Sequence, residues 1–273
     1  MKRQAAFALL LLLTACQARS NGFVTSTMTP DPPSPSRWLP TPGLTWQWQL
    51  SEPPVDLNPE AQVYDIDLFD NDASIIQALH RLGRKVVCYF SAGSWEDWRP
   101  DADRFPRELL GKEYIGWPGE RWLDIRRIDL LTPILTARFD LCASKGFDAV
   151  EPDNLQIADN DTGFPLNYQD QLAYAKWLAS EAHRRGLAIA LKNAPEMVAD
   201  ALPFFDFAIS EDCYSQGWCE ALLPFIQSGK AVFAAEYTDT GVDFPAACAW
   251  GREHHFSFIQ KNRILTAFRV TCP

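Results

Sequence analysis

The stretch GFDAVEPDN, residues 146–154, contains a glycine, a short apolar run and a polar end in direct succession. Gly146 stands where a left-handed residue ends a helix and turns the chain back towards a sheet. The run from Ala149 to Pro152 is long enough for one buried strand, and Asp153 and Asn154 follow at its carboxyl end. The succession of helix, glycine, strand and polar end is that of one βα unit of a parallel sheet.

This succession repeats along the chain, and Gly83, Gly186 and Gly229 each stand shortly before the next apolar run. We therefore expect eight strands, at residues 45–50, 62–68, 85–90, 149–152, 188–192, 205–210, 231–235 and 256–259. Amphipathic patterns between them predict helices at residues 73–82, 130–144, 168–185, 195–202, 219–227 and 245–254.

The fold class that follows is α/β, with residues 44–273 forming a single-domain (β/α)8 TIM barrel. An open doubly wound sheet is the alternative, but no glycine-rich phosphate loop follows the first predicted strand. Residues 91–127 are too long for a simple βα connection and are rich in Trp, Asp, Arg and Pro. We expect them to decorate one barrel end, with residues 122–125 as a possible ninth strand.

The first residues are typical of a targeting segment, with Lys2 and Arg3 before an apolar run over residues 5–13. The sequence LTAC, ending at Cys16, resembles a bacterial lipobox. We expect a lipoprotein signal peptide at residues 1–16, lipidation of Cys16 and a Ser/Thr/Pro-rich tether at residues 17–43. The protein would then be exported and membrane-anchored through the lipid alone. An ordinary secretory signal is the alternative.

Six cysteines follow Cys16, an even number in a chain expected to leave the cytosol, so disulfides are expected. Cys213 and Cys219 are close enough to staple one loop, and Cys88 with Cys142 could join a strand to a neighbouring helix. A zinc site is the competing interpretation, but the sequence has no CxxC motif and its four histidines lack ligand spacing. We expect neither a metal nor a cofactor.

The formal net charge is −10 and the sequence pI is about 4.9, with no basic run beyond the first residues. This composition argues against a nucleic-acid partner. An acidic surface favours a cationic ligand, although exported proteins are also acidic for solubility. No partner other than a ligand is indicated, and we expect a monomer.

In a barrel of this kind the active site lies at the carboxyl ends of the strands. Nearly every predicted strand ends in polar residues: Asp67, Tyr89, Asp153, Asn154, Lys192, Glu211, Glu236 and Tyr237. Several carboxylates around one opening would raise the pKa of at least one of them. Glycoside cleavage needs one carboxyl that donates a proton and a second that is ionised, and such a difference in pKa would provide both.

Ten tryptophans are present, and several fall in segments expected to face the cleft. These are Trp46, Trp48, Trp95, Trp98, Trp117 and Trp122. Aromatic faces stack on sugar rings and on cations. The alternative is that they fill the core, which we favour for Trp177 and Trp250 because both stand at helical positions.

Several motifs occur in a specific order and spacing: TWQWQL (45–50), DIDLFD (65–70), CYFSAGSWE (88–96), WLDIR (122–126), GFDAVEPDN, KN (192–193), SE (210–211) and EY (236–237). With these motifs the chain resembles glycoside hydrolase family 114, the endo-α-1,4-polygalactosaminidases, from about residue 38 to 265. The resemblance implies a TIM-barrel hydrolase acting on a cationic amino-sugar polymer such as an exopolysaccharide.

The resemblance also implies site residues. The aspartate of the EPDN motif falls on Asp153 and the glutamate ending the sixth strand on Glu211, so these two resemble the catalytic pair. Glu211 is favoured as nucleophile or base and Asp153 as acid, with the reverse assignment open. Glu151 is ambiguous: strand alternation could point it into the barrel below Asp153, where a buried carboxylate would be structural or would tune a pKa. Expected to line sugar subsites are Asp67, Tyr89, Trp95, Asp124, Asn154, Lys192, Glu236 and Tyr237.

Two rival functions remain. A non-catalytic surface lipoprotein that binds amino-sugar polymer would be expected to lack one of the two carboxylates, yet Asp153 and Glu211 are both present. A metal-dependent polysaccharide deacetylase would need His and Asp ligands at regular spacing, which the sequence does not offer. The polymer's acetylation, the stereochemistry of cleavage and the biological role stay open.

Overall fold

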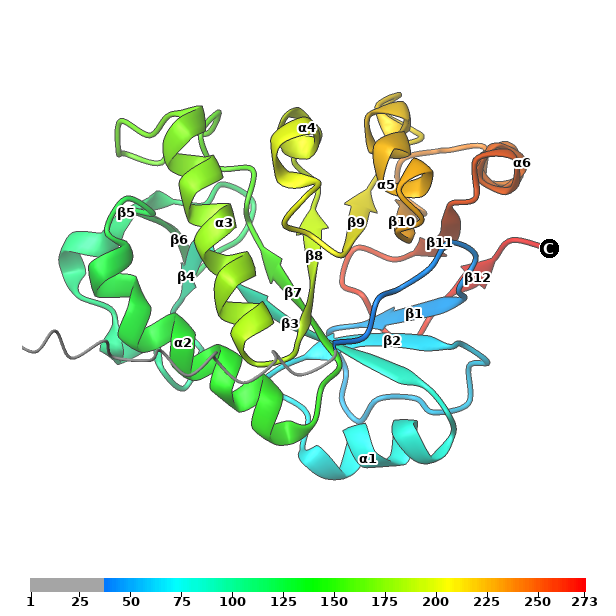
Figure 1. Cartoon of the computed structure of the whole chain (residues 1–273), viewed down its shortest axis with the longest axis horizontal. Helices are drawn as coiled ribbons and strands as arrows, with labels where there is room; N and C mark the ends of the chain where they lie inside the picture. Colours follow the sequence, from blue (N-terminus) through cyan, green and yellow to red (C-terminus); the bar gives the residue numbers. More distant parts are fainter. Residues whose placement is uncertain (1–36) are drawn as a thin grey trace, which may run out of the picture. The chain divides into compact units, whose positions relative to one another are not determined.

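The computed structural model describes residues 37–273, in which eight parallel strands curl into a barrel-like sheet (Figure 1). Their order in the sheet follows the chain, and a short antiparallel strand, β12 (Val270–Thr271), joins the last of them. The eight strands are β1 (Trp46–Gln49), β2 (Val63–Asp67), β3 (Lys85–Ser91), β7 (Ala149–Asp153), β8 (Ala188–Lys192), β9 (Phe207–Glu211), β10 (Val232–Tyr237) and β11 (Ser257–Lys261). The predicted TIM-barrel fold and its eight strands are confirmed.

Side chains rather than a backbone ladder close the barrel between β11 and β1. The indole Nε1 of Trp46 donates to the carbonyl of Ser257 at 2.8 Å. Arg269 Nη1 donates to the carbonyl of Trp46 at 2.7 Å, and Gln47 Nε2 donates to the carbonyl of Ala267 at 2.9 Å. The segment after β11 therefore covers the edge of β1.

Helices pack on the outside of the sheet in the order of the βα units (Figure 1). They are α1 (Ala73–Arg81), α2 (Ile128–Lys145), α3 (Tyr168–Arg184), α4 (Val198–Ala201), α5 (Leu223–Gln227) and α6 (Phe244–His254), with 3-10 turns before α4 and α5. Helix α2 ends at Gly146, whose φ of 93° is the expected left-handed cap. Within the described chain no helix connects β1 to β2, so the strict eightfold repeat is incomplete.

The long connection after β3 folds into a small antiparallel sheet of its own, with the order β4-β6-β5. Its strands are β4 (Ser94–Glu96), β5 (Leu110–Glu113) and β6 (Glu120–Leu123). The possible extra strand at residues 122–125 is present as β6, which begins and ends two residues earlier and pairs with β4 and β5 outside the barrel. An antiparallel hairpin needs only a short turn, which this connection supplies.

Two hydrophobic clusters form the core, one between sheet and helices and one inside the barrel. Trp46 and Trp48 belong to the inner cluster, and the rings of Trp46 and Phe233 lie 5.3 Å apart. Trp122 is also buried, with its ring centroid 4.1 Å from that of Tyr114. Trp46 and Trp122 therefore fill the core, contrary to the expectation that they face the cleft.

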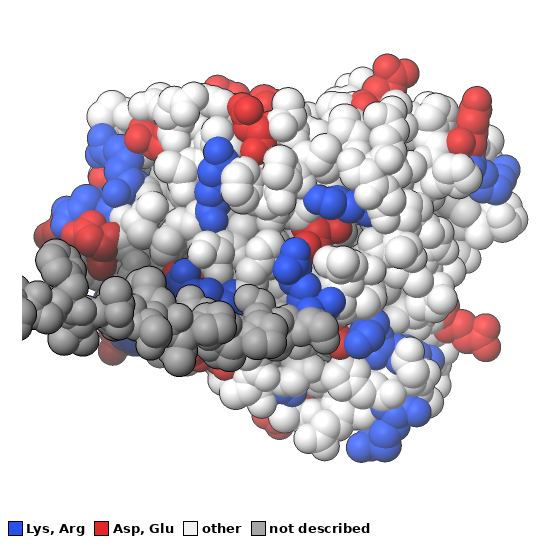
Figure 2. All heavy atoms as spheres, viewed as in Figure 1, with Lys and Arg blue, Asp and Glu red and all other residues white. Residues whose placement is uncertain are grey.

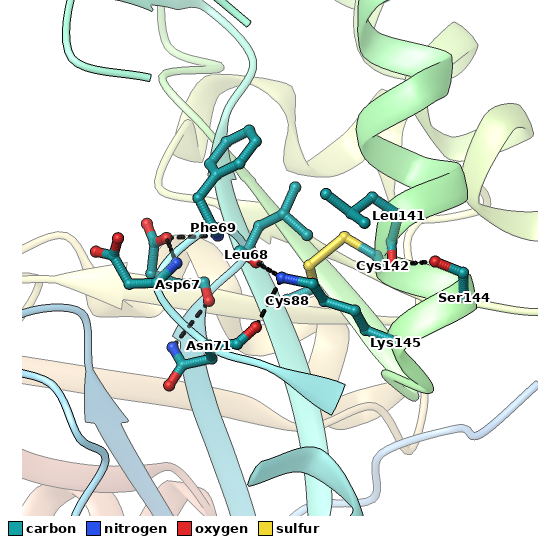
Figure 3. The surroundings of a disulfide bond; sticks show 10 residues. Asp67, Leu68, Phe69, Asn71, Cys88, Leu141, Cys142, Ser144 and Lys145 are labelled. Carbon is teal, nitrogen blue, oxygen red and sulfur yellow. Dashed lines mark hydrogen bonds between the residues drawn. A yellow bond between two sulfur atoms is a disulfide. The ribbon is translucent and has the colours of Figure 1, made fainter. Parts of the chain in front are cut away.

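Three disulfides are present, and they include both predicted ones. Cys88 on β3 joins Cys142 on α2, and Cys213 joins Cys219 within the loop after β9. Figure 3 shows the first of these beside Lys145, whose Nζ donates to the carbonyls of Leu68 and Asn71 at 2.7 Å each. The third disulfide, Cys248–Cys272, fastens the C-terminal segment to α6.

The first residues that the structure describes, Arg37 and Trp38, already contact the barrel. The Arg37 guanidinium lies 3.0 Å from the Asp206 carboxylate, and the Trp38 ring lies 6.3 Å from that of Phe207. These contacts begin before Leu44, where we expected structure to start. The predicted signal peptide, Cys16 and most of the predicted tether lie outside the described residues.

Charges of both signs are interspersed on the face of the molecule that Figure 2 shows. None of the helices among residues 37–273 has the length and apolarity that a bilayer crossing requires.

Candidate active site

A cavity of about 810 Å³ lies at the carboxyl ends of the barrel strands. Residues at or near the ends of seven strands line it: Trp48, Asp67, Tyr89, Asp153, Lys192, Glu211 and Tyr237. Because parallel strands all end on the same side, residues distant in sequence meet at this opening. Asn154 and Asn193 line it from the positions that follow β7 and β8.

The ammonium group of Lys192 is the centre of this site. Its Nζ lies 3.0 Å from Glu151 Oε1, 3.1 Å from Asp153 Oδ1 and 3.2 Å from Glu211 Oε2. It also lies 4.7 Å from the centroid of the Trp48 ring. Burial acts to lower the pKa of Lys192, but the carboxylates of Asp153, Glu151 and Glu211 outweigh it and raise this pKa well above its usual value. Lys192 is therefore a permanent cation shared by three acids.

Glu211 is held in its ionised form. Asn193 Nδ2 donates to Glu211 Oε2 at 3.0 Å, and the Glu211 amide donates to Asn193 Oδ1 at 2.9 Å. The Tyr237 hydroxyl donates to Glu211 Oε1. Burial acts to raise the pKa of Glu211, but the Lys192 charge and the hydrogen bonds from Tyr237 and Asn193 lower it overall.

Asp153 accepts hydrogen bonds from three donors. The Tyr89 hydroxyl donates to Oδ2 at 3.1 Å, while the Asn154 amide and Lys192 Nζ donate to Oδ1 at 2.8 and 3.1 Å. Burial and the nearby Asp153 charge raise the pKa of Tyr89 well above 10, so its hydroxyl stays protonated. These contacts fix both the position and the orientation of the Asp153 carboxylate.

The backbone turns sharply after each of the three strands that deliver these groups. Asn154, Asn193 and Asp212 all have positive φ, at 64°, 51° and 54°. Asn and Asp tolerate this conformation better than other residues with a side chain, and it persists where the surrounding structure enforces it. Asn154 is held by Nδ2 hydrogen bonds to Ser91 Oγ and Ser94 Oγ at 2.9 and 3.0 Å.

Below this layer lie two fully buried acids, Asp65 and Glu151, so of the alternatives left open for Glu151 the structure has the inward-facing one. None of their four carboxyl oxygens accepts a hydrogen bond from a described donor, although Lys192 lies close to Glu151. Burial raises the pKa of both groups, with mutual repulsion as the next contribution at Asp65. Two adjacent buried carboxyls with no donor are satisfied when they share one proton.

The structure brings five of the eight predicted substrate-binding residues to the cavity: Asp67, Tyr89, Asn154, Lys192 and Tyr237. Asp67 is fully engaged, since its Oδ2 lies 2.7 Å from Arg99 and its Oδ1 accepts from the amides of Phe69 and Asp70. It supports the wall of the cavity, and its carboxylate is only 2% exposed.

The other three predicted residues do not line the cavity. Strand side chains alternate, so Tyr237 faces the barrel interior and Glu236 faces outward, where it accepts from the amides of Tyr214 and Ser215. Asp124 follows β6 in the small sheet and binds Arg126 at 2.7 Å. Trp95 donates from Nε1 to the carbonyl of Ala102 at 2.9 Å.

Sequence reasoning missed several lining residues that come from connections rather than from strand ends: Arg99, Tyr114, Glu120, Gln216, Trp218 and Arg263. Trp98 and Trp117, which were expected near the cleft, do line it. No motif distinguishes the missed residues. Their shared signal was their place in the long, Trp-rich connection or in the loops after β9 and β11.

Cys213, Cys219 and Glu236 form the single group in residues 37–273 with metal-ligand proximity. Both sulfurs are in a disulfide and the Glu236 carboxylate caps backbone amides, so this group is structural.

A TIM barrel with two strand-end carboxylates around one cavity is the architecture of barrel glycoside hydrolases. The model of glycoside-hydrolase family GH114 matches residues 27–273, and the chain belongs to this family. It is a glycoside hydrolase.

Solved structures agree with this assignment. The crystal structure of Aspergillus fumigatus Ega3 in complex with galactosamine is 38% identical, with a TM-score of 0.82, over 87% of this chain and 98% of that one. The glycoside hydrolase domain of PelA from Pseudomonas aeruginosa shares the fold at 13% identity, with a TM-score of 0.64, over 84% of this chain and 98% of that one. No match was found among curated proteins.

Proposed function

We propose that the protein is an endo-acting hydrolase of α-1,4-galactosamine-containing polysaccharide that uses Asp153 and Glu211 as its catalytic carboxylates. One observation carries this proposal: both carboxylates line the cavity and contact the same Lys192 ammonium group, at 3.1 and 3.2 Å. One bond of a polymer laid across the opening is therefore within reach of both acids. Tyr89, Asn154, Asn193 and Tyr237 orient them.

The two carboxylates have different surroundings, which supports different roles. The lowered pKa of Glu211 favours the ionised form, as a nucleophile or base requires. We therefore assign that role to Glu211 and proton donation to the leaving oxygen to Asp153.

The short distance between the acids supports cleavage with retention of configuration. Asp153 Oδ1 and Glu211 Oε2 lie 3.1 and 3.2 Å from the same Lys192 Nζ, so one oxygen of each carboxyl contacts a single ammonium group. Inverting enzymes need roughly 6.5–9.5 Å between their carboxyl groups to admit a water molecule. Direct attack and a covalent glycosyl-enzyme intermediate fit the closer spacing.

The substrate class follows from the family and from the relative crystallised with galactosamine. The acidic chain, with a net charge of −10, would attract a polymer that carries free amines. Half-exposed Trp98 and Trp117 line the cavity and offer faces for stacking on sugar rings. A long polymer fits a cavity lined by several connections better than a small free sugar does.

We also propose that the protein is exported and anchored through Cys16. Three disulfides are typical of chains that fold in an oxidising compartment. Metabolic labelling with a palmitate analogue, comparing the wild type with Cys16→Ala, tests the anchor. Equal labelling of the wild type and Cys16→Ala would contradict the proposed anchor at Cys16.

The central experiment incubates the full chain with de-N-acetylated and N-acetylated α-1,4-galactosaminan and follows oligosaccharide release. We expect short oligomers to accumulate from the start, because an endo enzyme cuts within the chain. Binding of the polymer with no release would instead support the non-catalytic lipoprotein. Release of monosaccharides alone would contradict endo cleavage.

A further inference from the structure

One hairpin of the small sheet lies against the cavity. The turn between β5 and β6 is held by hydrogen bonds from the Tyr114 amide to the Glu120 carbonyl, at 2.9 Å, and from the Glu120 amide to the Trp117 carbonyl, at 3.0 Å. Tyr114, Trp117 and Glu120 all line the cavity, and Trp98 joins them from the turn after β4. This hairpin is an addition to the barrel and supplies none of the groups assigned to catalysis.

Within residues 37–273, two acids of the cavity form no ion pair, Asp70 and Glu120, and of these two only Glu120 is nearly buried. It is 8% exposed, and its Oε2 accepts a hydrogen bond from Ser94 Oγ at 2.6 Å. Apart from exposed Asp70, every other acid lining the cavity contacts a cation: Asp67 and Glu96 contact Arg99, Asp153 and Glu211 contact Lys192, and Asp212 contacts Arg263.

A nearly buried carboxylate without a cation is costly to ionise. Burial raises the pKa of Glu120, the hydrogen bond from Ser94 opposes this rise, and the charges of Glu96 and Asp153 add to it, giving a value of about 7. The charge of Arg99 acts in the opposite direction and lowers the pKa of Glu120. An incoming ammonium group would supply the missing positive charge.

The aromatic residues beside Glu120 complete a site for such a group. Trp98 and Trp117 are about half exposed, at 52% and 51%. A Cβ on Gly119 would lie 2.8 Å from Asp97 Oδ1 and 2.9 Å from a ring atom of Trp98, so the Asp97 carboxylate and this ring both pack on the residue before Glu120. Aromatic faces attract ammonium groups within about 6 Å, which adds to the attraction of the carboxylate.

The position of Glu120 places this site next to the catalytic carboxylates. Ser94 Oγ, the donor to Glu120, accepts a hydrogen bond from Asn154 Nδ2 at 3.0 Å. The Asn154 amide in turn donates to Asp153 Oδ1 at 2.8 Å. Glu120 is thus connected to Asp153 through the Ser94 side chain and through the side chain and backbone N–H of Asn154.

We propose that Glu120, with Tyr114, Trp98 and Trp117, binds the ammonium group of an unacetylated amino sugar in the subsite beside the bond that is cleaved. This inference rests on the proposed function and adds to it a residue that selects for a free amine. N-acetylation removes the positive charge and replaces it with a neutral, bulkier amide. An acetylated sugar would leave Glu120 without a cation.

The test compares the full-length wild type with Glu120→Gln on two defined probes, an α-1,4-linked galactosamine oligosaccharide with free amines and its fully N-acetylated form. Gln keeps an acceptor for Ser94 and removes only the charge. Loss of a charge-assisted hydrogen bond should lower kcat/KM for the amine probe about tenfold to a hundredfold. The value for the acetylated probe should change less than twofold. Glu113→Gln, an exposed acid on β5, is the matched control and should alter neither value.

Binding of both probes measured by calorimetry separates this inference from the proposed function. If the wild type cleaves neither probe, the proposed function fails, while weaker binding of the amine probe by Glu120→Gln still supports the ammonium site. Equal losses on the two probes would make Glu120 a catalytic or structural residue and overturn the inference, as would no loss on either.

A measurement on the wild type alone guards against misfolding of the variant. Below about pH 6.5 the amine probe stays fully charged while Glu120, whose pKa is raised to about 7, becomes protonated, so binding of the amine probe should weaken as the pH falls from 6.5 to 5, whereas binding of the acetylated probe should not. The same pH dependence for both probes would contradict the assignment.

Discussion

The ammonium group of Lys192 lies 3.0 Å from Oε1 of Glu151, a carboxyl that is completely buried. Glu151 precedes Asp153 by two positions on β7, so it lies one layer deeper in the barrel. Lys192 therefore connects a buried acidic layer to the two carboxylates that face the cavity. Its charge balances acids that would otherwise repel one another at the site of reaction.

The first prediction concerns this charge. Lys192→Met should lower kcat by at least about a hundredfold, because Glu211 would lose the cation that lowers its pKa. Leaving buried carboxylates without their cation should also lower the free energy of unfolding by about 3–5 kcal/mol. Steady-state kinetics and urea unfolding measure the two effects.

The matched control is Lys112→Met. Lys112 forms an ion pair with Asp161 at 2.6 Å, but both side chains are largely exposed. Exposed pairs contribute roughly 0–1 kcal/mol, so this variant should remain close to the wild type. Equal effects of the two substitutions would show that Lys192 has no special place in the site.

The second prediction concerns the shared proton of Asp65 and Glu151. Burial raises the pKa of Asp65 well above its usual value and that of Glu151 to about 7. The folded state therefore keeps a proton that the unfolded state releases near pH 4. The unfolded state binds fewer protons across this window, so the pair makes stability fall as the pH rises from about 4 to 7.

Asp65→Asn should flatten this pH dependence, because an amide donates to Glu151 without a proton to lose. Urea unfolding at several pH values between 4 and 8 measures the slope. Glu253→Gln, an exposed acid on α6, is the control and should keep the wild-type slope. A slope that Asp65→Asn leaves unchanged would show that the two carboxyls do not share a proton.

The sequence predicted the barrel because local signals agreed along the chain. Gly83, Gly146, Gly186 and Gly229 all have the expected positive φ, and the strands after them begin within a few residues of the predicted positions. The small sheet β4-β6-β5 was not predicted, since its strands are short and antiparallel and their pairing depends on tertiary contacts. The same limit applies to Cys248–Cys272, whose partners are on α6 and the C-terminal segment.

Strand ends predicted the polar residues at the centre of the cavity, among them Asp153, Lys192 and Glu211, because the fold brings the ends of parallel strands together. Side-chain direction was less certain. Glu236 and Tyr237 were both expected at the site, yet neighbouring residues on a strand face opposite sides and only Tyr237 lines the cavity. Glu120 was missed because it follows a turn in a connection whose path no local pattern specifies.

The third prediction tests the roles of the two carboxylates. Asp153→Asn and Glu211→Gln should each lower oligosaccharide release by about a thousandfold or more with little change in unfolding, since both groups act on the reacting bond. In a variant that lacks the acid, azide should restore turnover and the product should retain the anomeric configuration. In a variant that lacks the nucleophile, azide should also restore turnover, but the product should have the inverted configuration. We expect inversion with shortened Glu211→Gly and retention with Asp153→Gly, as followed by proton NMR. The opposite pattern would exchange the two roles.

The fourth prediction compares two disulfides that close loops of very different length. Cys88–Cys142 spans 54 residues and Cys213–Cys219 spans 6. By the loop-entropy relation the first should contribute about 4 kcal/mol to stability and the second about 2 kcal/mol. The shorter loop, however, carries Gln216 and Trp218, which line the cavity, and it directly follows Asp212, which also lines it.

The double variant Cys88→Ala/Cys142→Ala should therefore lose more stability, while Cys213→Ala/Cys219→Ala should lose more activity relative to its loss of stability. Opening the shorter loop also frees the amides of Tyr214 and Ser215 from the Glu236 carboxylate that holds them. The substrate wall would then become less ordered, which should raise KM more than it lowers kcat. Unfolding curves and kinetics on one polymer preparation provide both quantities. An unchanged KM in the Cys213→Ala/Cys219→Ala variant would show that hydrogen bonds alone hold this wall in place.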